Sequence, residues 1–383
     1  MHVLIAPDKF KGSLTAAEVA DALAAGIADA GCGWTTVQLP IADGGDGTVA
    51  AAVANGWTPV GVSTTGPTGR PLVANYAVRG DRAVVELASA VGLDKLPGRV
   101  PDPLGASTFG LGTVIAHALD HGAKDIVVGI GGSASTDGGA GLLQALGARV
   151  VDADGGDVGP GGGQLLRAVR LDLADLHPAV RETRFRVACD VDNPLLGSHG
   201  ATAVYGPQKG ATSSDLLVLE AAMSQWAQVV TAAVGTDVAG TPGSGAAGGT
   251  GFALFAVLDA VAHPGIELVL ELVDFESYLA DADLVITGEG CLDNQTLHGK
   301  APAGVAAAAR RRGVPVLAVA GRSLLTAEAL LAAGITRAYP LSELEPDPET
   351  SIANAAALLR KLGPRIVEEH TEPSITTRQG AAS

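Results

Sequence analysis

The segment HVLIAPDKFKGSLTAAEVADALAAGIADA, residues 2–30, begins with five mostly apolar residues and continues into an alanine-rich stretch. The apolar run predicts a buried strand over 2–6, and the later spacing predicts a helix from about residue 14 to 30. Thr15 and Glu18 have the spacing of a capping box at the start of that helix. A strand, a short loop and a helix in this order are typical of a parallel α/β sheet.

The same order returns near the end of the chain. Strands are expected at 35–39, 283–287 and 314–320, with helices at 301–312 and 323–333. We therefore predict that residues 1–65 and 275–370 together form one Rossmann-like α/β domain with a parallel sheet.

The middle of the chain has a different pattern. Residues 57–64, 71–79 and 82–87 read as successive strands joined by the turns GPTGRP and RGD, which is typical of antiparallel or mixed pairing. We predict that residues 66–274 form a second α/β domain with a mixed sheet, inserted into the first. The last residues, 371–383, lack apolar periodicity and are expected to form a disordered tail.

Composition narrows the class of protein. The 383 residues carry a net charge of −16 and no basic stripe, which argues against a nucleic-acid partner. No charge-free apolar segment reaches the roughly 18 residues of a membrane span. The three scattered cysteines fit a reduced chain, and we expect a cytoplasmic protein that does not bind membranes.

Lysines are few, and four of the seven lie in short loops beside glycines. These are Lys9, Lys11, Lys209 and Lys300. Lysine is a compact charge on a flexible stem, suited to carboxylate or phosphate oxygens in a tight pocket. Lys9 and Lys11 follow the first strand together with Asp8, at the edge of a parallel sheet where ligands usually bind.

Three further loops combine glycines with polar side chains. The segment LPIADGGDGT (39–48) carries Asp43 and Asp46, and GIGGSASTDGGAG (129–141) carries Ser133 and Asp137. Carboxylates there could hold a cation or accept a proton, and hydroxyls with bare amides could bind an oxyanion. In GSGAAGGTG (243–251), a phosphate cradle is expected at Gly248, Gly249 and Gly251, with Lys209 as a further nucleotide ligand.

Two loops are rich in acids. In ACDVDNPLLG (188–197), Asp190 and Asp192 are alternate residues of an extended segment and could converge on one cation. The segment ITGEGCLDNQTLHGKAP (286–302) is the densest cluster, with Glu289, Asp293 and Lys300 after a buried strand. His298 is expected to be a solvated or hydrogen-bonding residue, because nothing pairs it with a nucleophile.

These residues together suit phosphoryl transfer. The reaction needs carboxylates for magnesium, cations for anionic oxygens and a base near the acceptor hydroxyl. We assign Asp190 as the base, Lys9 and Lys300 as cationic groups at the reacting phosphate, and Asp192, Glu289 and Asp293 as metal ligands. Substrate ligands are then expected among the remaining strand-end residues Asp8, Lys11, Asp43, Asp46, Ser133 and Asp137.

At these motifs the sequence resembles the glycerate kinases of the bacterial class I type. The motifs are APDKFKGS, IADGGDGT, GGSASTDGGAG, CDVDNPLLG, YGPQKGA and TGEGCLDNQTLHGKAP, in the family's order from residue 1 to about 370. Cys291 stands where some members have Ser or Arg, which should not affect the chemistry.

The resemblance implies two α/β domains, ATP and Mg²⁺ as cofactors, and D-glycerate as substrate. It favours 2-phosphoglycerate over 3-phosphoglycerate as product and leaves the oligomeric state open. The alternative is an oxidoreductase with a dinucleotide at GSGAAG, which needs a strand before Gly243 and an acid near Asp259. A non-enzymatic binding module is a third possibility, which the density of carboxylates and lysines disfavours.

Overall fold

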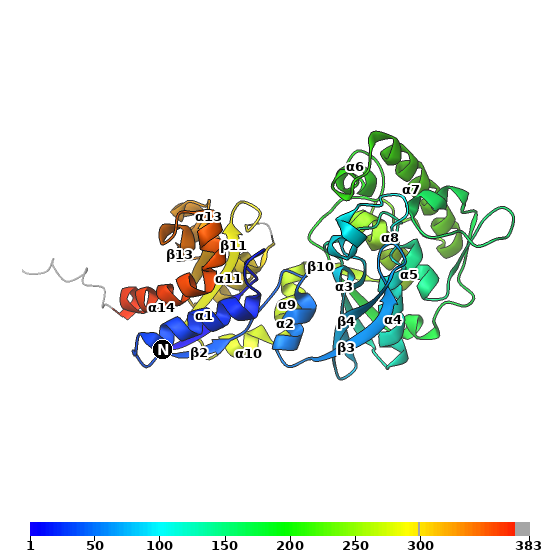
Figure 1. The fold of residues 1–383 in the computed structure, drawn as a ribbon. Coiled ribbons are helices and arrows are strands. Elements are labelled where there is room, and N and C mark those ends of the chain that lie inside the picture. The colour runs from blue at the N-terminus through cyan, green and yellow to red at the C-terminus, as the bar shows by residue number, and fades with distance from the viewer. Residues whose placement is uncertain (298, 372–383) are drawn as a thin grey trace, which may run out of the picture. The chain divides into compact units, whose positions relative to one another are not determined.

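The structure is a computed structural model, and it describes residues 1–297 and 299–371. His298 and residues 372–383, which include all but the first residue of the expected tail, lie outside the described residues. The chain forms two compact units, Met1–Ala42 with Leu270–Ser383, and Asp43–Val269 (Figure 1). Each unit has its own sheet, and each is described by itself.

The first unit contains a five-stranded sheet in which every pairing is parallel. Its order is β13-β12-β11-β1-β2. The central pairing joins distant segments, because Val3 to Pro7 of β1 lie opposite Leu284 to Gly288 of β11. The strands are β1 (His2–Pro7), β2 (Thr35–Gln38), β11 (Leu284–Leu292), β12 (Val316–Ser323) and β13 (Arg337–Pro340). The predicted parallel sheet built from both ends of the chain is confirmed.

Helices α1 (Ala16–Asp29) and α14 (Ala355–Thr371) pack side by side in the first unit (Figure 1). The predicted capping box at α1 is present, since Glu18 N donates to Thr15 Oγ1 and Thr15 N donates to Glu18 Oε2. The other helices of this unit are α10 (Phe275–Leu279), α11 (Ala301–Arg311), α12 (Ala327–Ala332) and α13 (Pro348–Ala353).

The second unit contains a six-stranded mixed sheet of order β10-β9-β6-β5-β4-β3. The strands from β5 to β10 pair in parallel, while β3-β4-β5 is an antiparallel meander. The strands are β3 (Thr58–Thr65), β4 (Pro71–Arg79), β5 (Arg82–Glu86), β6 (Asp125–Gly129), β9 (Arg184–Ala188) and β10 (Val261–His263), with a separate hairpin of β7 (Arg149–Val151) and β8 (Arg170–Asp172). The predicted mixed sheet is confirmed. Strand β3 pairs with β4 and so belongs to this sheet, although residues 58–65 were expected in the first domain. The predicted domain limits stay a prediction.

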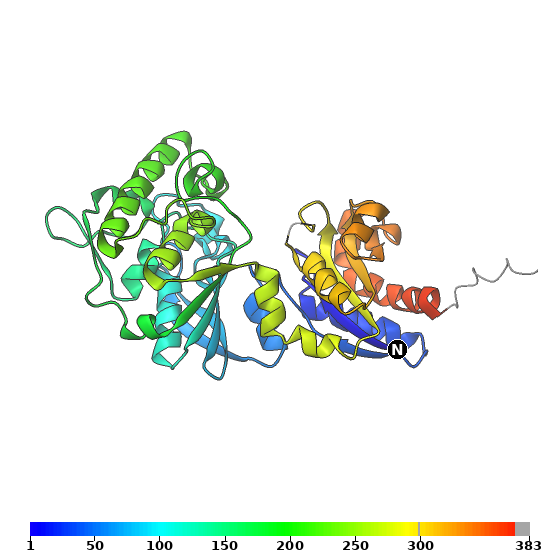
Figure 2. The same cartoon turned by 180° about the vertical axis from the view of Figure 1, so that it is seen from behind.

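Helix α7 (Ser213–Val234) is the long green helix of the second unit in Figure 2. Among the described residues it is the one helix long and apolar enough to cross a membrane by length and composition, a test that core helices also pass. Its Trp226 is fully buried in the core and donates Nε1 to the Gly138 carbonyl, 3.0 Å away. The remaining helices are α2 (Thr48–Ala54), α3 (Leu87–Val91), α4 (Phe109–Asp120), α5 (Ala140–Ala145), α6 (Ala201–Tyr205), α8 (Ala246–Leu258) and α9 (Gly265–Leu272).

Candidate active site

A cavity of about 260 Å³ lies at the carboxyl ends of β6 and β9 in the second unit. We call it the strand-end cavity. Parallel strands direct their following loops to one edge of the sheet, which is where α/β proteins usually bind ligands. Four segments far apart in the sequence line it: 43–45, 130–133, 188–191 and 205–209, with Leu93 and the start of α8. The cavity therefore unites four of the loops selected from the sequence.

Two carboxylates, Asp43 and Asp190, line this cavity. Asp190 Oδ1 accepts from Gly265 N at 2.9 Å, and Asp43 Oδ1 accepts from Gly45 N at 3.1 Å. Burial raises the pKa of the Asp190 carboxyl, the Gly265 amide opposes this rise, and the negative charge of Asp43 adds to it. A raised pKa makes Asp190 a stronger proton acceptor at neutral pH.

Lys209 is the buried cation of the strand-end cavity, with a residue exposure of 2%. Its Nζ donates to the Ser135 carbonyl. Burial lowers the pKa of Lys209 to about 7, against an opposing effect of the Asp137 carboxylate. A Cβ at Gly248 would lie 2.7 Å from Nζ and 2.1 Å from the Ser135 carbonyl oxygen. A glycine at 248 thus leaves room for the ammonium group.

Replacing Lys209 should change how the stability of the protein depends on pH. Its pKa is about 7 when folded and 10.5 ordinarily, so between these values the unfolded chain binds more protons. The free energy of unfolding therefore rises with pH over this window through Lys209, and Lys209→Met should lose that rise. Urea unfolding at pH 7, 8 and 9 measures it, with Lys361→Met, an exposed lysine, as control. Parallel curves for the wild type and Lys209→Met would contradict the expectation.

Loop 130–139 has one side at the cavity and another in the core. Ser133 lines the cavity, whereas Asp137 is 1% exposed and does not. Asp137 Oδ2 accepts from Thr108 N at 2.7 Å, Thr108 Oγ1 at 2.8 Å and Gly141 N at 3.2 Å. Burial raises the pKa of Asp137, and these bonds oppose the rise. In this structure Asp137 holds the loop against the start of α4; its assignment to the substrate stays a prediction.

The expected phosphate cradle of Gly248, Gly249 and Gly251 is closely packed. All three residues are buried and none lines the cavity, which Ala246 and Ala247 reach instead. Their assignment to ATP stays a prediction. Residues 189–260, all of them described, contain no strand, so the strand required before Gly243 by the dinucleotide alternative is missing.

Asp46 and Asp192 are exposed and do not line the strand-end cavity. Strand β9 ends at Ala188, so Asp190 and Asp192 lie in the segment that follows it. Of the two, only Asp190 lines the cavity. The metal role of Asp192 and the substrate role of Asp46 stay predictions.

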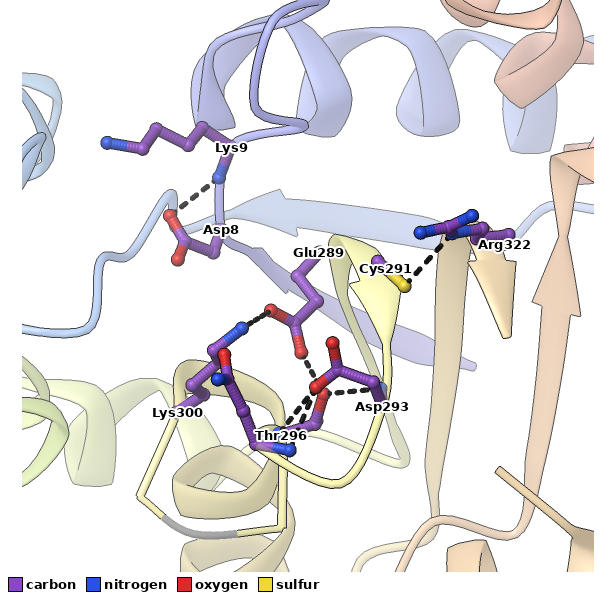
Figure 3. Close-up of polar contacts among 9 residues, drawn as sticks. Asp8, Lys9, Glu289, Cys291, Asp293, Thr296, Lys300 and Arg322 are labelled. Carbon is purple, nitrogen blue, oxygen red and sulfur yellow. Dashed lines mark hydrogen bonds and ion pairs between the residues drawn. The ribbon is translucent and has the colours of Figure 1, made fainter. Parts of the chain in front are cut away.

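In the first unit, β1 and β11 bring a second set of polar residues together (Figure 3). Asp8 follows β1 directly, and its backbone N donates to the Gly288 carbonyl of β11 at 2.8 Å. Lys9 N donates to Asp8 Oδ1 at 2.6 Å. Because the two strands are parallel neighbours, the 8–13 and 288–300 segments follow the same edge of this sheet, as expected. Lys11 is exposed on the first of these segments.

Glu289 is the buried centre of that set, with an exposure of 6%. Its Oε1 accepts from Thr296 Oγ1, and its Oε2 lies 3.3 Å from Lys300 Nζ (Figure 3). Burial raises the pKa of Glu289, and Thr296 and Lys300 oppose the rise. Asp293 Oδ1 accepts from Gln295 N at 2.8 Å. Asp293 N donates to Thr296 Oγ1 at 2.9 Å, so Glu289, Asp293 and Lys300 are joined in one network through Thr296.

The position of Glu289 corrects one expectation. The predicted strand ends at residue 287, but β11 continues to Leu292, which pairs with Ser323 of β12. The glycine at 288 permits close packing, because a Cβ there would lie 2.4 Å from the Val319 carbonyl oxygen. Glu289 is therefore held by a strand, while Lys300 directly precedes α11 at Ala301, as expected.

The donor set fits a magnesium ion that arrives with phosphates. Within residues 1–297 and 299–371, no group of three or more His, Cys, Asp or Glu side chains is placed to hold a metal. Carboxylates do occur in pairs, Asp43 with Asp190 and Glu289 with Asp293. Magnesium in nucleotide enzymes is typically held by one or two carboxylates plus substrate phosphates and water. Either pair therefore supplies enough carboxylates to hold one magnesium ion.

Several residues of these sites were missed by the sequence analysis. Glu86, at the end of β5, accepts from Gly47 N and Thr48 N and so fixes the 43–47 loop. Its position as a terminal acid of a buried strand was a usable signal. Tyr205 and Gln208 line the strand-end cavity from the segment that carries Lys209, and Gly265 contacts Asp190. No sequence signal marked Gly265.

Two α/β units whose strand-end loops carry paired carboxylates and lysines define an enzyme that handles anionic substrates. The family model described as the glycerate kinase family matches residues 3–371. The chain belongs to this family, as the resemblance implies.

Individual proteins similar to this chain are also named glycerate kinases. Glycerate kinase of Bacillus subtilis (strain 168) is 46% identical over 344 residues, 89% of this chain and 90% of the relative. Glycerate 2-kinase of Escherichia coli (strain K12) is 43% identical over 330 residues, which is 84% of this chain and 85% of the relative. A solved structure assigned as glycerate kinase 2 from Salmonella typhimurium LT2 is 41% identical, with a TM-score of 0.84 over 97% of this chain and 100% of that one.

Proposed function

We propose that this protein is a kinase that transfers a phosphoryl group from ATP to D-glycerate with Mg²⁺, giving 2-phosphoglycerate. The family match over residues 3–371 carries the proposal. The name of the E. coli relative, a glycerate 2-kinase, favours the 2-hydroxyl as acceptor. Asp43, Asp190 and Lys209 in one cavity support it chemically, since phosphoryl transfer requires acids and cations at the same site.

We assign the proton acceptor to Asp190, whose raised pKa suits removal of a proton from the acceptor hydroxyl. Lys9 and Lys300 neutralise the transferring phosphate, and Lys209 binds nucleotide phosphate. Glu289, Asp293 and Asp192 would hold magnesium, which would supply positive charge to offset that of the phosphates. The remaining ligands position glycerate: Asp8, Lys11, Asp43, Asp46, Ser133 and Asp137.

Removing the charge of Asp293 should raise the magnesium requirement. Asp293→Asn keeps an Oδ1 that can accept from Gln295 N, so the turn is preserved while a negative ligand is lost. The magnesium concentration for half-maximal rate should rise about tenfold, which corresponds to roughly 1.4 kcal/mol, and excess magnesium should restore the maximal rate. Gln295→Ala, an exposed neighbour, is the control. An unchanged magnesium titration would remove Asp293 from the metal site.

The activity itself is tested by a coupled assay with ATP, magnesium and D-glycerate. An assay of nicotinamide absorbance beside it tests the dinucleotide alternative, which the missing strand before Gly243 disfavours. Phosphorus NMR of the product then distinguishes 2- from 3-phosphoglycerate. Absence of ADP formation with D-glycerate would refute the proposal.

We also expect a cytoplasmic protein whose partners are small molecules, with no nucleic acid and no membrane. The three cysteines, Cys32, Cys189 and Cys291, are all free thiols in the structure, in keeping with a reducing compartment. The oligomeric state is left open.

A further inference from the structure

A second cavity of the same unit, with a volume of about 570 Å³, shares no residue with the strand-end cavity. We call it the hairpin cavity. Two Gly/Pro segments border it: the 65–69 turn between β3 and β4, and residues 157–160 beyond β7. The loop before α4 and the end of α5 complete it. Its volume falls within the range of small-molecule sites, about 300–1,000 Å³.

The walls of the hairpin cavity are largely apolar. Phe109, the first residue of α4, lines it and is 42% exposed, while Pro67, Val158 and Pro160 line it from the two Gly/Pro segments. An aromatic ring that is accessible inside a cavity offers a surface on which a flat heterocycle can stack.

Two polar side chains of the hairpin cavity, Gln144 and Asp102, are placed to accept hydrogen bonds. Gln144 Nε2 donates to the Val158 carbonyl at 2.9 Å, which orients the amide and leaves Oε1 as an acceptor. Asp102 Oδ1 accepts from Gly105 N at 2.9 Å, and Oδ2 has no protein partner among the described residues. The one cation of the lining, Arg149, is paired with Asp157 at 2.9 Å. The lining is net negative and suits an uncharged ligand that donates hydrogen bonds.

We propose that the hairpin cavity binds an adenine nucleoside. Adenine supplies a flat ring for Phe109 and an exocyclic amine for Gln144 Oε1, a pairing that amide side chains make with adenine in nucleic acids. The ribose hydroxyls supply donors for Asp102, as acidic residues bind ribose in dinucleotide sites. The negative charge of Asp102 disfavours a phosphate inside the cavity, so the phosphates of a nucleotide are expected outside it.

One loop, residues 130–139, links the walls of the hairpin cavity and the strand-end cavity. Ile130 to Ser133 line the strand-end cavity, and Asp137 of the same loop bonds Thr108, which lies between the hairpin-cavity residues Ser107 and Phe109. The nucleoside has two possible sources, the nucleoside end of ATP or a free nucleoside. Only the first rests on the proposed kinase function.

Calorimetric titration of the full-length protein with adenosine, without phosphates, tests the proposal independently of turnover. Adenosine should bind, and inosine, which lacks the exocyclic amine, should bind several-fold more weakly. Phe109→Ala should weaken adenosine binding about tenfold, as expected for loss of one stacked base. Thr68→Trp, at an exposed position of the bordering turn, should obstruct the cavity and abolish binding. Tyr278→Ala, an aromatic of 45% exposure in the first unit, is the matched control and should leave binding unchanged.

Absence of adenosine binding, or binding that both cavity variants leave unchanged, overturns the proposal. The KM for ATP then identifies the source of the nucleoside. A rise in KM by the same factor in Phe109→Ala means that the nucleoside is that of ATP, while an unchanged KM with weakened adenosine binding means a separate nucleoside site. Failure of glycerate phosphorylation with adenosine binding intact would refute the kinase function and leave this site standing.

Discussion

Asp190→Asn is expected to lower turnover by about 10²- to 10⁴-fold, the usual contribution of a positioned general base, with little change in ATP binding. The substitution keeps an Oδ1 that can accept from Gly265 N, so the loop after β9 should remain in place. What is lost is the proton acceptor. Steady-state kinetics with D-glycerate, together with ATP titration of the variant, separates the two effects.

Two further measurements support that assignment. Because the pKa of Asp190 is raised, the acidic limb of the pH–rate profile should lie above the usual carboxylate range, and it should disappear in the variant. Asp281→Asn removes one exposed carboxylate of the first unit and serves as a charge control. Near-normal turnover of Asp190→Asn would place the base elsewhere, with Asp43 or Asp8 as the next candidates.

Gly265→Ala should lower turnover by about a hundredfold, the scale of loss when reacting groups are displaced by about 1 Å. A Cβ on Gly265 would lie 2.0 Å from the Asp43 carbonyl oxygen and 3.0 Å from Asp190 Oδ2, so the added methyl group must push both segments apart. Neither carboxylate is itself altered. Gly265→Ala therefore tests whether the relative position of Asp43 and Asp190 affects turnover. An acid-to-amide substitution cannot test this, because it removes the carboxylate itself.

The matched control is Gly240→Ala, because a Cβ there meets nothing within 4 Å and its φ is not positive. Circular dichroism and a melting curve establish that both variants are folded before kinetics are compared. Turnover of Gly265→Ala equal to that of Gly240→Ala would show that the Asp43–Asp190 geometry is not important for the reaction.

Local signals predicted much of the fold. Apolar runs located β1, β11 and β12, and the capping-box spacing of Thr15 and Glu18 located the start of α1. Because the carboxyl ends of parallel strands share an edge, the loops after these strands could be selected as sites before any contact was known. Asp43, Ser133 and Asp190 were selected from loops rich in glycine or acids, and Lys209 from the lysines beside glycines; all four line one cavity.

Several glycines lie where two segments of the chain pack closely, which the local sequence does not reveal. A Cβ at Gly288 would lie 2.4 Å from the Val319 carbonyl oxygen, and a Cβ at Gly248 would lie 2.1 Å from the Ser135 carbonyl oxygen, so neither position leaves room for a side chain. Glycine can be required either because the backbone bends there or because another segment packs closely against it. Only knowledge of that other segment tells which reason applies. The contact of Gly265 with Asp43 joins residues more than 200 positions apart, and no local pattern encodes it.

The pairing of β1 with β11 has a consequence for biosynthesis. A ribosome releases residues 2–7 first, but their neighbour at 284–292 appears only after most of the polypeptide has been made. The contiguous unit 43–269 can fold in that interval, since domains generally fold as units during synthesis. The nascent N-terminal strand meanwhile has no β11 to pair with, and its apolar edge is exposed to other chains. Premature termination before residue 284 would therefore leave a folded inner unit carrying an unpaired, aggregation-prone N-terminal segment.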